Sequence, residues 1–130
     1  MPALNYHKQF APAIEAGQKL QTIRAMRKVP VKAGDTLYHY TGMRTKACRL
    51  LGVSTCQSAN QIDIIRWAGN RAVFLQDCPG GGQRRLTNME ILDLATKDGF
   101  KHTDTFFDWF VSDNHHFTGQ LITWSEITPF

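Results

Sequence analysis

The sequence predicts a single α+β domain over residues 1–130, in which short strands form a barrel or a strongly curved sheet flanked by helices. Several short strand-like segments separated by turns are typical of such a sheet. Two segments instead carry apolar residues at helical spacing. The chain of 130 residues has the length of one domain with its own core.

The strand segments are recognised by β-branched and aromatic residues between turn signals. Ile62, Ile64, Ile65 and Trp67 provide this content in one segment, and the compact turn 68–70 follows it directly. A closing strand is expected near the C-terminus, at 117–124. The other predicted strands cover 22–24, 36–41, 46–57, 61–67 and 71–76.

Three helices are expected between these strands. The first covers 10–16 and ends at Gly17, a residue suited to the left-handed position after a helix. The second begins at Thr87, which forms a capping box with Glu90, and stops at Gly99. The third is the aromatic segment 104–112. The glycine-rich segment 78–85 is predicted to be an irregular loop.

Composition limits the class of protein. The chain is 42% hydrophobic and 20% charged, which is ordinary for a globular protein. It has neither an apolar run of bilayer length nor a signal-peptide stretch, so a soluble cytoplasmic protein without a membrane partner is expected. Cys48, Cys56 and Cys78 lack metal-ligand spacing, so we expect buried or half-buried thiols, no metal site and no cofactor.

Charge is unevenly distributed along the chain. Residues 19–49 hold eight lysines and arginines against Asp35 alone, whereas residues 86–130 hold seven acids against two lysines. A concentrated positive region attracts polyanions through counterion release. The alternative is that strands simply place their basic residues outward. The asymmetry therefore favours a nucleic-acid partner without identifying it.

Residues 17–24 carry the most informative pattern. Lys19, Thr22 and Arg24 offer an ammonium, a hydroxyl and a guanidinium at the start of a strand. Such a group can hold an anion or a polarised carbonyl. The alternative is an ordinary helix–turn–strand corner whose polar side chains are solvated.

The pattern Phe10-x-x-x-Ile14-x-x-Gly17-x-Lys19-x-x-Thr22-Ile23-Arg24, with Gly34-Asp35 soon after, resembles the ASCH domain family of PUA-like β-barrels. The likeness continues through Ala95-x-x-Asp98-Gly99-Phe100, the aromatic helix and the closing strand. It therefore covers nearly the whole chain and implies one ASCH-like domain over 1–130.

The resemblance implies specific site residues. Small bacterial members of the family that hydrolyse N(4)-acetylcytidine use a lysine and a threonine of this motif and a glutamate further along. By position these are Lys19, Thr22 and Asp98, which is one methylene shorter than glutamate. Lys19 would then take a proton from Thr22 or from water, Arg24 or backbone amides would stabilise the oxyanion, and Asp98 would position the amine or transfer a proton.

Two other functions stay open. A non-catalytic module would bind RNA or a modified nucleoside, with basic residues on phosphates and aromatic residues stacked on bases. Its expected ligand-binding residues are Arg24, Arg27, Lys28, Tyr38, Trp67, Arg84 and Arg85. A ribonuclease is the third possibility, with Lys19, Arg24 and His39 as its participants. We place recognition of RNA or a modified nucleoside first; the sequence leaves the oligomeric state open.

Overall fold

The computed structural model describes residues 2–77 and 81–129. The chain forms two compact units whose segments alternate along the sequence. The first unit comprises Met1–Gln21, Val31–Ala59 and Ile122–Phe130. The second comprises Thr22–Pro30 and Asn60–Leu121.

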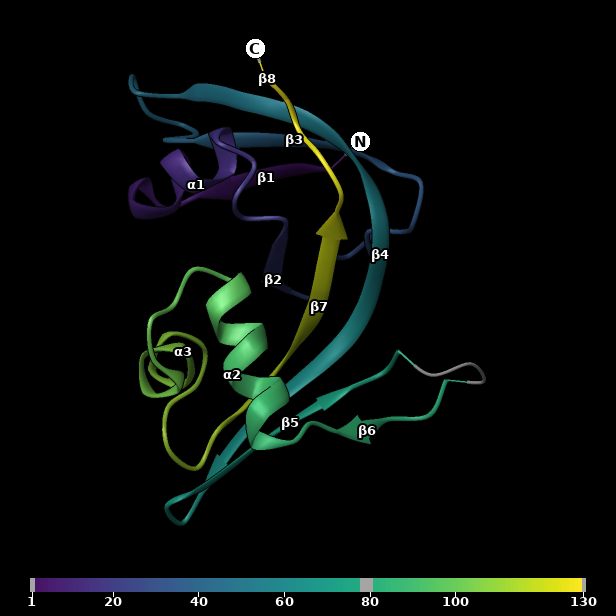
Figure 1. The fold of residues 1–130 in the computed structure, drawn as a ribbon, viewed down its shortest axis with the longest axis vertical. Coiled ribbons are helices and arrows are strands. Elements are labelled where there is room, and N and C mark those ends of the chain that lie inside the picture. Colours follow the sequence, from purple (N-terminus) through teal and green to yellow (C-terminus); the bar gives the residue numbers. More distant parts are fainter. Residues whose placement is uncertain (1, 78–80, 130) are drawn as a thin grey trace. The chain divides into compact units, whose positions relative to one another are not determined.

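The first unit is built around β3, Thr36–Thr41 (Figure 1). Strand β1, Ala3–Tyr6, pairs with β3 in parallel, and the beginning of β4, Arg49–Trp67, pairs with it antiparallel. The short β8, Thr128–Pro129, adds to the same part of β4. A 3-10 turn, η1 at Lys8–Phe10, leads into helix α1, Ala11–Glu15. The core of the first unit includes Leu4, Ile14, Leu37, Leu51 and Trp124.

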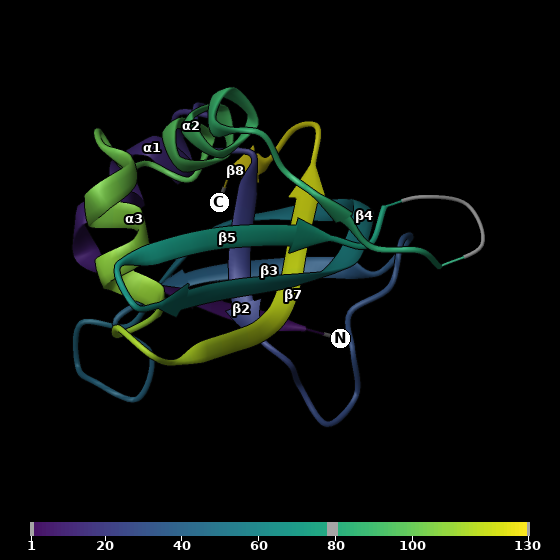
Figure 2. The same cartoon turned by 90° about the horizontal axis from the view of Figure 1, so that it is seen from below.

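The second unit contains an antiparallel sheet and two helices. The end of β4 pairs with β5, Asn70–Leu75, which pairs with the two-residue β6, Arg84–Arg85. Strand β2, Gln21–Ala25, pairs with β7, His116–Trp124; Gln21 and the residues of β7 from Ile122 on are counted with the first unit. Helices α2, Asn88–Lys97, and α3, Thr103–Phe110, complete the unit and lie next to β5 in Figure 2.

Arginines on one face of this sheet connect it to the helices. Directly paired residues of antiparallel strands place their side chains on the same face, so Arg66 of β4 and Arg71 of β5 share one. Arg66 binds Asp108 and Arg71 binds Asp104, and both aspartates belong to α3. Apolar residues of the same strands, including Ile62, Ile64, Val73 and Leu75, are almost fully buried.

Strands β2 and β7 come unusually close at Gly119. A Cβ atom at this position would collide with the carbonyl oxygen of Arg24 and would lie 2.8 Å from the ring of Phe117. Only glycine leaves room for the β2 backbone here. The residue type at 119 thus fixes how closely β7 approaches the strand that carries Thr22 and Arg24.

The α+β class and the three predicted helices are confirmed. Thr87 and Glu90 form both hydrogen bonds of the capping box. Gly17 and Gly99 have φ values of +73° and +98°, the left-handed conformation expected after a helix. The expected strands at 22–24, 36–41 and 117–124 correspond to β2, β3 and β7.

Two local predictions were wrong. The segments 46–57 and 61–67 belong to one strand, β4, which also pairs with β7; the hydroxyl of Ser58 in its middle lies 2.5 Å from that of Thr123 in β7. Arg84 and Arg85 were expected in a loop but pair with β5. Strands β1 and β8 were not anticipated. The loop prediction for 78–80 falls on residues outside those the structure describes.

Across the described ranges 2–77 and 81–129, no helix combines the length and hydrophobicity needed to cross a bilayer.

Candidate functional site

The motif lysine lies in the first unit and is withdrawn from solvent. The last turn of α1 ends at Gly17, and the chain then turns toward β2. Lys19 is only 4% exposed, and its Nζ lies 5.0 Å from the centroid of the Phe10 ring. An ammonium at this distance from an aromatic face is attracted by the ring quadrupole. Two residues of the resemblance pattern are thus in contact.

The motif threonine lies on β2 in the second unit. Thr22 is 4% exposed, and its Oγ1 accepts a hydrogen bond from Nε of Arg24 at 3.1 Å. Because Arg24 carries a permanent charge, this bond favours negative charge on the threonine oxygen. The two side chains point to the same side of the strand, as residues two apart do.

Asp98 caps the C-terminus of α2 in the second unit, as the sequence predicted. Its backbone N–H donates to the carbonyl of Leu94 at 3.0 Å, and the residue is 4% exposed. Buried aspartates are rare unless they are hydrogen-bonded or paired. Asp98 is thus a buried carboxylate at the end of α2, not one of the solvated acids that are common at helix ends. Its convergence with Lys19, which belongs to the other unit, stays a prediction.

Most of the predicted ligand-binding residues are accessible. Arg27, Lys28 and Arg85 are exposed. Trp67, at the end of β4, is 40% exposed, and Tyr38 on β3 is half-buried. Exposed arginine and lysine side chains can reach phosphates, and an exposed indole offers a stacking surface.

Arg84 differs from its neighbour Arg85. Its Nε and Nη2 donate to the two carboxylate oxygens of Asp77 at 2.9 Å each, and its Nη1 donates to Glu90 at 2.6 Å. These hydrogen bonds raise the pKa of Arg84. We therefore assign Arg84 to the link between β6 and α2 rather than to a ligand.

His39, a participant in the ribonuclease hypothesis, is completely buried in the first unit. Its Nδ1 lies 2.9 Å from the Tyr6 hydroxyl and its Nε2 lies 2.7 Å from the Ser54 hydroxyl. The ring also packs against Trp124, with 4.5 Å between the ring centroids. Both imidazole nitrogens thus have hydroxyl partners inside the core, which favours a structural role for His39 over the one expected at a phosphate.

The cysteines follow the expectation in part. Cys56 is buried, its Sγ donates to the carbonyl of Ser58 at 3.3 Å, and burial raises the pKa of the thiol. Cys48 is exposed in the turn before β4, so its expected burial was wrong. Cys78 lies outside the described residues. No cluster of potential metal ligands occurs within 2–77 and 81–129.

A polar cluster around Asp63 was not anticipated. Oδ1 of this buried carboxylate lies 2.9 Å from Nε2 of His116 and 2.7 Å from Oγ1 of Thr118. Oδ2 accepts from the side-chain amides of Gln61 at 3.2 Å and Gln83 at 2.7 Å. Desolvation opposes ionisation, but the hydrogen bonds from Thr118, His116 and Gln61 outweigh it and lower the pKa of Asp63.

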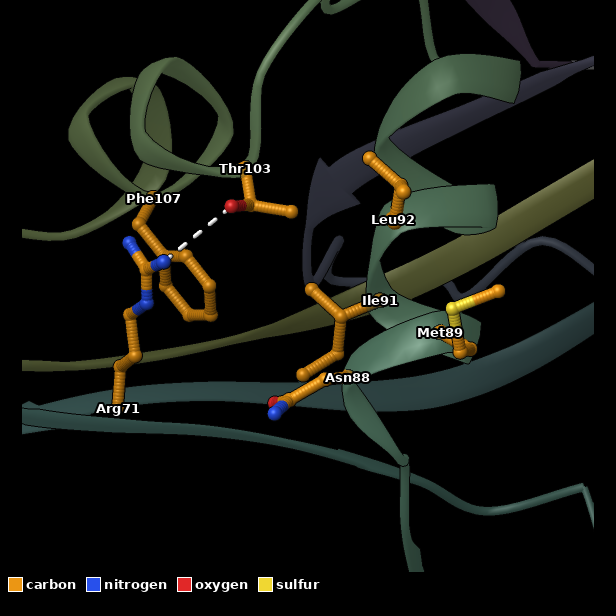
Figure 3. Close-up of a pocket in the computed structure, with 7 residues that line it drawn as sticks. All are labelled: Arg71, Asn88, Met89, Ile91, Leu92, Thr103 and Phe107. Atoms are coloured by element: carbon orange, nitrogen blue, oxygen red, sulfur yellow. Dashed lines mark hydrogen bonds between the residues drawn. The ribbon is translucent and has the colours of Figure 1, made fainter.

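A cavity of about 440 Å³ lies in the second unit, between β5, α2 and α3 (Figure 3). Among the described residues that line it, Arg71 alone is charged; its Nη2 donates to Oγ1 of Thr103 at 3.2 Å. The guanidinium carbon of Arg71 lies 4.7 Å from the Phe107 ring centroid. The rest of the lining comes from α2: Asn88, Met89, Ile91 and Leu92. Sequence reasoning missed this site because it joins elements that are remote along the chain.

Comparison of the chain with protein-family models, curated proteins and solved structures found no match.

Proposed function

We propose that this chain is an ASCH-like domain with a PUA-like barrel that binds a modified nucleoside, free or within RNA, at the motif 17–24. The burial of Lys19 and Thr22 carries this proposal. A corner of solvated polar residues would leave both side chains exposed, whereas each is only 4% exposed. Lysine is almost never fully buried unless it is paired, and this lysine lies over the ring of Phe10, so the motif is a specifically packed feature that can position its polar groups for a ligand.

The ligand class follows from what the motif offers. A buried ammonium and hydroxyl suit the carbonyl and amine edge of a small heterocycle better than a hydrated phosphate. The exposed Arg27, Lys28 and Arg85 then contact phosphates of a longer strand, while Trp67 or Tyr38 stacks on a base. These outer contacts explain why the ligand can be part of an RNA chain.

A second candidate, deacylation of an N(4)-acetylcytidine-type nucleoside, is favoured by the bond between Arg24 and Thr22. A cationic donor 3.1 Å from Oγ1 stabilises the alkoxide that attack on an acetyl carbonyl requires. Lys19, as the neutral amine, would accept the threonine proton and return it to the exocyclic nitrogen, which Asp98 would position, so that cytidine leaves as the acetyl group is transferred to Thr22. Water then hydrolyses the acetyl-threonine ester, so that the products are acetate and cytidine.

Two measurements separate these functions. Isothermal titration of the protein with cytidine, N(4)-acetylcytidine and a short single-stranded RNA tests binding. We expect the nucleosides to bind with little dependence on salt and the RNA to bind more weakly as salt increases. Chromatography of the N(4)-acetylcytidine sample tests for cytidine and acetate.

The variant Thr22→Val, which keeps the shape of the side chain but removes the hydroxyl, distinguishes the two roles. A binding module loses the hydrogen bond of the Thr22 hydroxyl and with it part of its affinity, up to about tenfold, and the wild type shows no turnover. A hydrolase loses turnover while it still binds. Absence of nucleoside and RNA binding by the wild-type protein would refute the proposal.

A further inference from the structure

We propose that the cavity between β5, α2 and α3 binds a small organic acid, a carboxylate on a short apolar stem. The seven lining residues belong to the second unit, and none of them is part of the motif 17–24. This site is therefore independent of the proposed nucleoside site. Its volume of about 440 Å³ falls within the range of small-ligand pockets.

The positive charge of Arg71 indicates that the ligand is negatively charged. Within the described parts of the chain, Arg71 is the one charged residue that lines the cavity, and the other six lining residues provide no carboxylate. Arg71 is held in place by Thr103 and by stacking on Phe107, which is itself buried. A guanidinium fixed in this way is prepared for a carboxylate, whose two oxygens match its planar array of donors.

The carboxylate that Arg71 now binds is easily replaced. Nη1 of Arg71 contacts Asp104, whose side chain is 80% exposed, so the two form a surface ion pair. Exposed ion pairs contribute little to stability because water and salt screen them. A ligand carboxylate can take the place of Asp104 while Thr103 and Phe107 keep the guanidinium in position.

The apolar side chains that α2 contributes to the cavity indicate that the ligand carries an apolar stem. Ile91 and Leu92 line the cavity with apolar side chains, and Met89 is 76% exposed beside them. In Figure 3, Ile91 and Asn88 project from α2 toward the side of the cavity formed by Arg71 and Phe107. An apolar stem would cover these side chains, and burial of apolar surface contributes to affinity in proportion to area. The amide of Asn88 offers an additional hydrogen-bond donor to the acid.

The test compares hexanoate with hexanamide, which has the same stem but no charge. Titrations of the full chain are followed by NMR chemical shifts of the backbone amides of α2 and α3. We expect hexanoate to bind about tenfold more tightly than hexanamide, because a charge-assisted pair is replaced by a neutral one. Equal affinities for the two compounds would overturn the proposal.

Three variants make the test specific. Arg71→Met is expected to weaken hexanoate binding about tenfold. Arg66→Met is the matched control, since Arg66 makes the same kind of pair with Asp108 but does not line the cavity. Asp104→Asn is expected to strengthen binding about threefold, because it removes the competing carboxylate. A purely structural role of Arg71 predicts no such gain.

Leu92→Asp tests the same site independently, so the proposal stays testable if Arg71→Met does not fold. Leu92 is 43% exposed, so its replacement removes little core packing, and the new carboxylate would repel the ligand. Unchanged hexanoate binding in Leu92→Asp would contradict the proposed position of the stem. A peptide with a free C-terminal leucine that binds more tightly than hexanoate would overturn the choice of a small acid.

Discussion

Nζ of Lys19 lies 5.0 Å from the centroid of the Phe10 ring, beneath a surface that leaves the lysine only 4% exposed. Phe10 begins the motif pattern and Lys19 is its first charged residue. The aromatic ring thus shields one side of the ammonium and attracts it at the same time. This contact supports the proposal that Lys19 faces a bound group rather than bulk water.

The first prediction concerns Gly119. The variant Gly119→Ala should lower the free energy of unfolding by about 1–3 kcal/mol, because the added methyl group meets the carbonyl oxygen of Arg24. Chemical denaturation measures the change. Gly82→Ala is the control, since a Cβ at Gly82 would have no atom within 4 Å. Equal stability of the two variants would contradict the close approach of β2 and β7.

A second prediction concerns acid stability. The pKa of Asp63 is lower in the folded protein than in the unfolded chain, so the unfolded chain binds the proton more readily. The resulting stabilisation is complete above the unfolded pKa, near pH 4, and is lost as the pH falls through the lower folded value. The unfolding free energy of the wild type should therefore fall more steeply below about pH 4 than that of Asp63→Asn.

At neutral pH the same Asp63→Asn variant should be less stable by about 1–3 kcal/mol, because the donors of His116 and Thr118 lose a charged acceptor. Asp113→Asn, at an exposed position, serves as the control. Denaturation at a series of pH values gives both results. Parallel pH profiles for the wild type and Asp63→Asn would show that this carboxylate does not control acid stability.

The third prediction concerns the start of α2. Thr87→Ala removes the side chain that accepts from the N–H of Glu90 at 3.2 Å and should cost about 1 kcal/mol. Thr96→Ala provides a comparison in the same helix. Thr96 is exposed, and alanine has the higher helix propensity, so that variant should be neutral or slightly stabilising. Thermal unfolding measures both changes in stability: a decrease for Thr87→Ala, and no change or a small increase for Thr96→Ala.

Local signals predicted the helices correctly. The capping box at Thr87 and the left-handed glycines at 17 and 99 act within a few residues, so the sequence shows them directly. Strand boundaries depend on partners instead. The expected strands stop at 57 and resume at 61, whereas β4 continues through this interval, where Ala59 and Asn60 have low β propensity, because tertiary pairing overrides propensity.

The candidate sites also differ in whether their residues are close together in the sequence or are brought together by the fold. The motif 17–24 is contiguous, so its lysine and threonine could be identified from the sequence. The Asp63 cluster joins β4, β7 and Gln83, and the Arg71 cavity joins β5 to two helices. Such juxtapositions arise from strand register and helix packing. Contacts made elsewhere in the chain also bear on His39 and Arg84: His39 is buried between Tyr6 and Ser54, whereas Arg84 is half-exposed and bound by Asp77 and Glu90.

The most direct test of the nucleoside site is the affinity of N(4)-acetylcytidine for Lys19→Met, measured by calorimetry beside Lys28→Met. Each variant removes one positive charge close to the motif, but Lys19 is buried and Lys28 is exposed. We predict that Lys19→Met weakens binding at least about tenfold and that Lys28→Met changes it less than about twofold. Equal affinity of the wild type and a folded Lys19→Met would contradict the assignment of this motif as the ligand site.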